Sequence, residues 1–167
     1  MKPVHNSIRQ IVSCVVLLAL SGLAPVEAQT GPVDKDLHIL ALRACLETQA
    51  REFARVLSRD ELFNAVVERN DHIRVDAPER LGDFRIEYLS QDDLLKRFRS
   101  TNRVIPVLVL GPTTINGGDV VIHVVRYQVG ANRTMLEYGL EGGCHVYLRF
   151  DCDQQVYVVR ETRLWGV

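Results

Sequence analysis

The stretch that decides the fold is DVVIHVVRYQVGANRTMLEYGLEGGCHVYLRFDCDQQVYVVRETRLW, residues 119–165. β-Branched and aromatic residues alternate in it with polar ones, which is typical of half-buried strands. Together with a similar run at 104–110, it predicts five strands: 104–110, 119–129, 134–140, 144–150 and 156–165. The predicted turns between them are 116–118, 130–133, 141–143 and 151–155. Short connections join antiparallel neighbours, so we expect the last four strands to form an antiparallel meander.

The turn lengths also predict the register of these strands. A two-residue turn at 131–132 places Tyr127 opposite Leu136, and a five-residue loop at 151–155 places Cys144 opposite Thr162. The opposite face then pairs Arg126 with Glu137 and His145 with Glu161. The predicted buried face is apolar: Val121, Val125, Leu136, Leu140, Val146, Leu148, Phe150, Val156 and Val158. A one-residue slip would break this agreement, which therefore supports the register.

Residues 34–58 supply a partner for that face. Their apolar residues recur at steps of three and four, the period of an amphipathic helix: Ile39, Leu42, Leu46, Ala50, Phe53 and Leu57. Ser58 starts a second short helix to about Arg69, a loop fills 70–83 around a short strand at 73–75, a strand spans 84–89, and Ser90 caps a helix over 92–99. We expect an α+β fold, with N-terminal amphipathic helices packed on a curved antiparallel sheet.

The first 28 residues have the pattern of a secretory signal. Lys2 and Arg9 give a positive start, residues 11–20 are apolar, and Val26-Glu27-Ala28 supplies small residues for cleavage after Ala28. The alternative is an uncleaved anchor. After a short lead-in at 29–33, residues 34–167 form one domain, which we expect to be secreted or periplasmic and free of the membrane once the signal is removed.

Composition narrows the function classes. The chain has 167 residues, of which 47% are hydrophobic, with 20 basic and 21 acidic side chains. A net charge of -1 argues against a dedicated nucleic-acid-binding protein, which would carry a basic excess. The motifs that hold a metal or a phosphate-bearing cofactor are not found, so we expect neither a metal nor a cofactor.

Three cysteines remain after signal removal. Cys144 and Cys152 lie too far apart along one extended strand to bridge. Cys45 borders the helical stripe and Cys144 points to the same interior, so Cys45–Cys144 is the preferred disulfide. The alternative is that both are buried free thiols. Cys152 lies between two aspartates in a turn, and we expect it to be exposed and not activated as a nucleophile.

Polar residues on the predicted buried face are the candidate site: His123, Tyr127, Tyr138 and Arg160. Together they would line a concave pocket for a small, partly anionic ligand. The alternative for His123 and the tyrosines is ordinary core packing, and for Arg160 a position near the strand end with its charge in water. No catalytic residue is identified.

The order of the elements and the C-terminal tail carry a resemblance. The tail reads TMLEYGLEGGCHVYLRF followed by DCDQQVYVVRETRLWGV, and it resembles the ends of uncharacterised secreted bacterial proteins. The element order resembles that of nuclear-transport-factor-two-like and cystatin-like proteins with a cone-shaped fold. That resemblance implies a sheet curled round a helix, sometimes enclosing a pocket in which enzymes of this fold use an Asp, His or Tyr.

These features favour a binding or interaction module without catalysis, which contacts a small ligand or a partner protein. One alternative is a small enzyme with His123 as general base, and another is an inhibitor or immunity-type protein. A homodimer through the sheet face is a further expectation.

Overall fold

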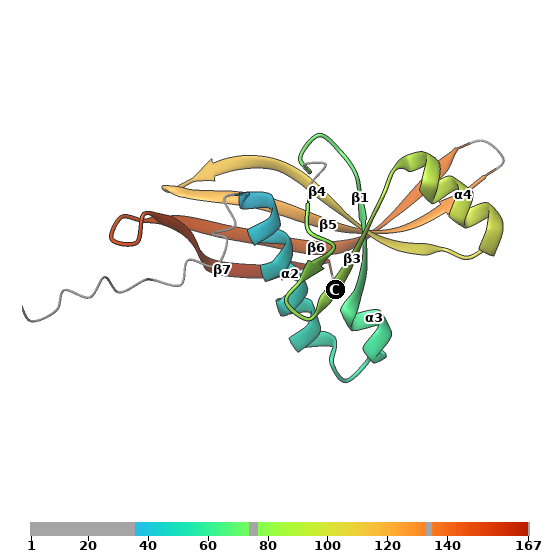
Figure 1. The fold of residues 1–167 in the computed structure, drawn as a ribbon, viewed down its shortest axis with the longest axis horizontal. Coiled ribbons are helices and arrows are strands. Elements are labelled where there is room, and N and C mark those ends of the chain that lie inside the picture. The colour runs from blue at the N-terminus through green and yellow to red at the C-terminus, as the bar shows by residue number, and fades with distance from the viewer. Residues whose placement is uncertain (1–35, 74–76, 133–134, 167) are drawn as a thin grey trace, which may run out of the picture. The chain divides into compact units, whose positions relative to one another are not determined.

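The computed structural model describes residues 36–73, 77–132 and 135–166 (Figure 1). The helices are α2 (Leu37–Phe53), α3 (Arg59–Phe63) and α4 (Gln91–Thr101). The strands are β1 (Asn64–Glu68), β2 (Arg80–Leu81), β3 (Phe84–Leu89), β4 (Ile105–Asn116), β5 (Asp119–Ala131), β6 (Leu136–Asp151) and β7 (Val156–Trp165). The α+β class is confirmed. The predicted signal, the lead-in and most of the strand predicted at 73–75 lie outside the described residues.

One sheet holds all seven strands, in the order β2-β3-β1-β4-β5-β6-β7. Strand β1 runs parallel to both β3 and β4, whereas the other neighbours are antiparallel. The predicted all-antiparallel sheet is therefore wrong, and the sheet is mixed. The difference arises at residues 64–68, which were expected to continue a helix. Val66 and Val67 are β-branched and fit a strand that is covered on both faces.

Strand β6 is continuous from residue 136 to 151, so the loop predicted at 141–143 is wrong. The register shifts there instead, with Arg126 opposite Gly142 and Tyr127 opposite Leu140, which leaves Glu141 as the extra residue of a β-bulge. Glycine is needed because the backbones approach closely. A Cβ on Gly143 would lie 2.2 Å from the carbonyl oxygen of Val124.

The strand registers differ from the predicted ones. Tyr127 lies opposite Leu140 rather than Leu136, and Thr162 lies opposite Val146 rather than Cys144. The first error arises at the turn predicted at 131–132, because Ala131 still belongs to β5 and pairs with Leu136, so the connection is longer than two residues. A bulge in β7 adds a second shift, between Tyr147 and Leu148.

We call the side of the sheet that packs on α2 the inner face and the other side the outer face. On β5 the inner residues are Ile122 and Val124, both fully buried in the core with α2. The predicted faces of β5 are therefore inverted, and Val121, His123, Val125 and Tyr127 lie on the outer face. Leu136, Leu140 and Val158 also lie there, because they pair with outer-face residues. The predicted inner position of Val146 and Leu148 is confirmed.

Helix α2 is held on the inner face by burial and by a disulfide. The predicted stripe is confirmed in its first half, where Ile39, Leu42 and Leu46 are buried. The predicted Cys45–Cys144 disulfide joins α2 to β6, with 5.8 Å between the two Cα atoms. The helix ends at Phe53 rather than at 58. Cys152 is exposed and free, as expected.

Helix α4 covers part of the outer face. Its residue Leu94 is fully buried and packs with Ile105, Val107 and Val129 in a second, smaller core. The capping box predicted at Ser90 is confirmed: its side chain accepts a hydrogen bond from the backbone of Asp93, whose carboxylate reaches back to Ser90. Within the described residues, none of the helices has both the length and the apolar character needed to cross a membrane.

Candidate functional site

A groove runs along the inner face beside the C-terminal half of α2. Its largest part is a cavity of about 650 Å³ between α2, α3 and strands β1, β4 and β5. Leu46, Ala50, Leu57, Ala65 and Leu108 supply apolar walls. The apolar stripe that is buried in the core in the first half of α2 therefore lines a cavity in the second half.

Two further cavities continue the first. One of about 320 Å³ shares Gln49, Leu57 and Arg126 with it, and another of about 270 Å³ shares Phe53 and Leu164 with the second. Because neighbouring cavities share wall residues, they lie side by side from β4 across β5 and β6 to β7. We call the residues that line these three cavities the α2 groove.

A polar cluster lies at the centre of the α2 groove. Nε of Arg126 is 2.8 Å from Oε2 of Glu141, and the side-chain amide of Gln128 donates to Oε1 of the same carboxylate at 2.6 Å. The bulge in β6 turns Glu141 toward these two side chains. The predicted pair of Arg126 with Glu137 is therefore wrong: Arg126 lies on the α2 side of the sheet.

The disulfide borders this cluster. Gln49 lines both larger cavities, and its amide nitrogen lies 4.0 Å from Sγ of Cys144. The covalent bond between α2 and β6 therefore holds one wall of the α2 groove at a set distance from its floor. A site that is fixed before a ligand arrives loses less conformational entropy on binding.

Two of the sequence-predicted site residues meet on the outer face. The rings of Tyr127 and Tyr138 pack edge to face with their centroids 5.6 Å apart. The Tyr138 hydroxyl donates a hydrogen bond of 2.9 Å to Glu68. Burial, together with this carboxylate, raises the pKa of Tyr138 well above its usual value.

Glu68 is a polar residue that the sequence reasoning missed. It is only 6% exposed, and it also accepts a hydrogen bond of 3.0 Å from the amide of Gln91 at the start of α4. The helix predicted from Ser58 to about Arg69 hid it, because residue 68 belongs to a strand. The paired valines before it are the signal for a strand.

His123 lies elsewhere on the outer face, opposite His145. Their rings are 4.5 Å apart and nearly perpendicular, and Trp165 follows at 5.8 Å from His145. Burial lowers the pKa of His145, and the neighbouring His123 and Arg163 lower it further. The neutral form of this imidazole is therefore favoured.

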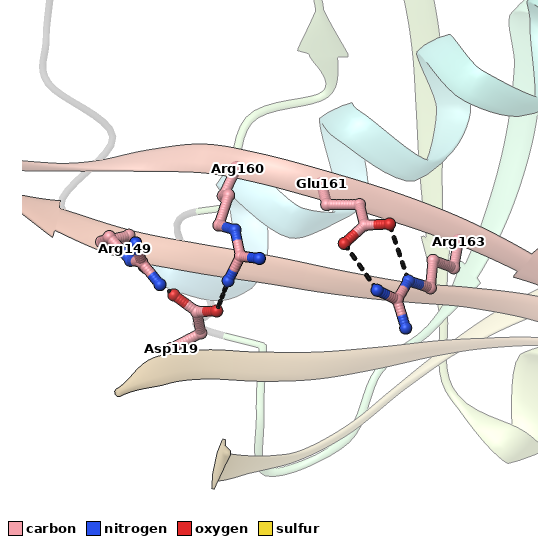
Figure 2. Close-up of polar contacts among 5 residues, drawn as sticks. All are labelled: Asp119, Arg149, Arg160, Glu161 and Arg163. Atoms are coloured by element: carbon pink, nitrogen blue, oxygen red, sulfur yellow. Dashed lines mark hydrogen bonds and ion pairs between the residues drawn. The ribbon is translucent and has the colours of Figure 1, made fainter. Parts of the chain in front are cut away.

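Arg160 forms a third cluster with Asp119 and Arg149 (Figure 2). It is the extra residue of the β7 bulge, since Tyr147 pairs with Glu161 and Leu148 with Val159. Asp119 is 3% exposed and bonds both guanidinium groups, with Arg149 at 2.8 Å. The hydrogen bond from Arg149 is the main reason that the pKa of Asp119 is lowered.

The structure thus places the four predicted residues in three separate clusters: Tyr127 with Tyr138, His123 with His145, and Arg160 with Asp119. None of the four lines the α2 groove. The polar residues that do line it are Gln49, Glu52, Asp60, Asn64, Arg126, Gln128 and Glu141. They follow no motif, because packing of α2 and the bulge in β6 bring them together.

No known protein family, no curated protein and no solved structure matches the chain.

Proposed function

We propose that this chain is an exported protein that binds a small amphipathic molecule in the α2 groove and carries out no chemistry on it. The observation that supports this most is the cavity of about 650 Å³, whose walls combine apolar side chains with the polar side chains of Gln49, Arg126 and Gln128. Small-molecule sites are typically clefts of roughly 300–1,000 Å³ that combine apolar walls with a few placed polar groups.

The lining indicates the chemistry of the ligand. An apolar body would pack on Leu46, Ala50 and Leu57, while a polar or anionic head would reach Arg126. Glu141 lies against Nε of Arg126, so the two terminal nitrogens of the guanidinium are the donors for that head. Gln49 and Gln128 add amide groups that both donate and accept.

Two features support export. A disulfide between Cys45 and Cys144 is typical of proteins that leave the reducing cytosol, and residues 1–28 have the pattern of a signal. We also infer kinship with nuclear-transport-factor-two-like proteins. The supporting feature is a helix that lies against a sheet beside a pocket.

The test uses anilinonaphthalene sulfonate, a fluorescent probe with an apolar ring system and an anionic group. Wild-type protein should bind it saturably, with enhanced fluorescence. Ala50→Trp should abolish this binding because the indole fills the largest cavity, and Arg126→Gln should weaken it about ten-fold because a charged hydrogen bond is lost.

The matched controls are Ala54→Trp and Arg43→Gln. Ala54 is exposed at the end of α2, and Arg43 is exposed in an ion pair with Glu47. Both variants should bind the probe like wild type. Equal binding by wild type and Ala50→Trp would overturn the proposal.

A small enzyme with His123 as general base is the competing proposal. It places the chemistry on the outer face, where His123 contacts His145, rather than in the α2 groove. His123→Ala distinguishes the two, because it should leave probe binding unchanged if the α2 groove is the functional site.

A further inference from the structure

Strand β7 forms one edge of the sheet. Its neighbour in the sheet is β6, and no backbone hydrogen bond to any other part of the described chain is found for residues 156–165. The outward N–H and C=O groups of an edge strand are a template for pairing with another strand. Ten residues are long enough for a stable ladder.

The outer face of this edge carries charges of both signs in a fixed order. Glu161 and Arg163 point to the same side of β7 and bond each other, with nitrogen–oxygen distances of 2.7 and 2.9 Å (Figure 2). Both side chains are partly exposed. An opposite charge on a neighbouring strand would therefore find a ready counterpart.

We propose that two copies of this chain pair through antiparallel β7 strands, about a two-fold axis at Thr162. Residues opposite each other then have numbers symmetric about that position, so Glu161 faces the partner's Arg163 and Arg163 faces the partner's Glu161. Opposite charges at directly facing positions stabilise a strand pair. The interface is isologous, as closed dimers require.

The charges select one register. A shift of two residues in one direction places Glu161 against the partner's Glu161, and a shift in the other direction places Arg163 against the partner's Arg163. A shift of one residue puts the outer face of one copy beside the inner face of the other, which the two sheets cannot accommodate. Only the register centred on Thr162 pairs unlike charges.

The bulge in β7 improves the fit beyond the charged centre. Arg160 is the extra residue of the bulge and has no residue opposite it. Beyond Arg160, each residue therefore faces a partner residue one number lower than symmetry about Thr162 alone would give. Val159 then faces the partner's Leu164 on the inner face, and Val158 faces the partner's Trp165 on the outer face. These two valines are 39% and 37% exposed in the single copy, and pairing covers them.

This edge-to-edge dimer is distinct from the dimer through the sheet face that the sequence suggested, and it does not rest on the ligand proposed for the α2 groove. The test measures association of the purified chain by analytical ultracentrifugation and native mass spectrometry. Wild type should be a dimer. Glu161→Arg and Arg163→Glu should each weaken dimerisation roughly ten- to a hundred-fold, because two attractive pairs become two repulsive ones.

Mixing the two single variants gives the decisive test. The Glu161→Arg and Arg163→Glu variants carry complementary charges, so an equimolar mixture should form a heterodimer although neither variant dimerises well alone. The double variant with both changes should dimerise like wild type. Glu47→Arg, a charge reversal in the exposed Arg43–Glu47 pair on α2, is the matched control and should not affect association.

A monomeric wild type would overturn the proposal, and so would dimers that survive either single reversal. A mixture that stays monomeric would overturn it as well, because that result assigns the loss in the single variants to the fold and not to facing charges.

Discussion

Helices α2 and α4 cover opposite faces of the same sheet by different means. Helix α2 packs on the larger core and is tied to β6 by the Cys45–Cys144 disulfide. Helix α4 packs on a core built around Leu94 and is positioned by its capping box and by the bond from Gln91 to Glu68. The covalently held face is also the one with the groove. A cavity beside a helix remains open when the helix is tethered and cannot move to fill it.

Among the changes that probe the two helices, removal of the disulfide should lower the free energy of unfolding most. Cys45→Ala with Cys144→Ala opens a loop that spans 99 positions, and a constraint of that length contributes roughly 4 kcal/mol to the free energy of unfolding. Urea unfolding followed by circular dichroism would measure the loss. Cys152→Ser, which changes an exposed free thiol, should leave the unfolding midpoint unchanged.

Truncating one buried leucine on each helix compares the two faces directly. Leu42 and Leu94 are both fully buried. We expect Leu42→Ala to cost about 3 to 4 kcal/mol and Leu94→Ala about 2 to 3 kcal/mol, because a tethered helix cannot move to fill the space and an untethered one can. Denaturant midpoints would measure both costs. Equal costs would contradict the idea that the disulfide limits relaxation.

Glu68→Gln changes how α4 is positioned while it retains the shape of the side chain. We expect it to cost about 1 to 2 kcal/mol, since bonds to a charged acceptor become bonds to a neutral one. It should also lower the pKa of Tyr138 toward its usual value, which ultraviolet titration of the phenol would detect. Asp119→Asn serves as the control and should not affect that titration.

The raised pKa of Tyr138 also gives a pH dependence with a defined sign. A folded-state pKa above the unfolded value of 10.0 means that the folded protein favours the protonated phenol. This contribution to stability is complete below the unfolded-state pKa and is lost as the pH rises toward the folded-state pKa. Tyr138→Phe should therefore show a shallower loss of stability above pH 10 than wild type, in unfolding measured across that range.

Ser90→Ala should have the smallest effect. It removes the hydroxyl that accepts from the backbone of Asp93, and loss of such a cap costs about 1 kcal/mol. Thermal unfolding would measure it. Ser100→Ala, at the other end of α4, should be close to neutral, and a similar loss there would show that the cap has no special role.

The elements that the sequence predicted well depend on local rules. The apolar spacing of α2, the cap at Ser90 and the turn at 116–118 each involve residues close together in the chain. The disulfide was also predicted correctly, because Cys144 keeps its inner position even though the predicted register of its strand was wrong. The bulge at Glu141 inverts the predicted faces of residues 136–140, but it precedes Gly142 and therefore leaves the face of Cys144 unchanged.

The errors have a common origin in contacts between distant strands. The glycines at 142–143 were interpreted as a turn, but glycine is equally required where Val124 approaches β6. Residues 64–68 were interpreted as helix, but two parallel neighbours make them a strand. Short segments of this kind have no strong intrinsic preference for one type of secondary structure.

The amino-acid sequence by itself determined the class of fold, the helix that covers the inner face and the pair of cysteines that fastens it, because periodicity and capping act within a few residues. Only the tertiary structure decided that Arg126 faces α2 in a groove and that Glu68 lies buried beside Tyr138. Both depend on register, and one bulge residue in β6 or one strand in place of a helix reverses which side chains face each other.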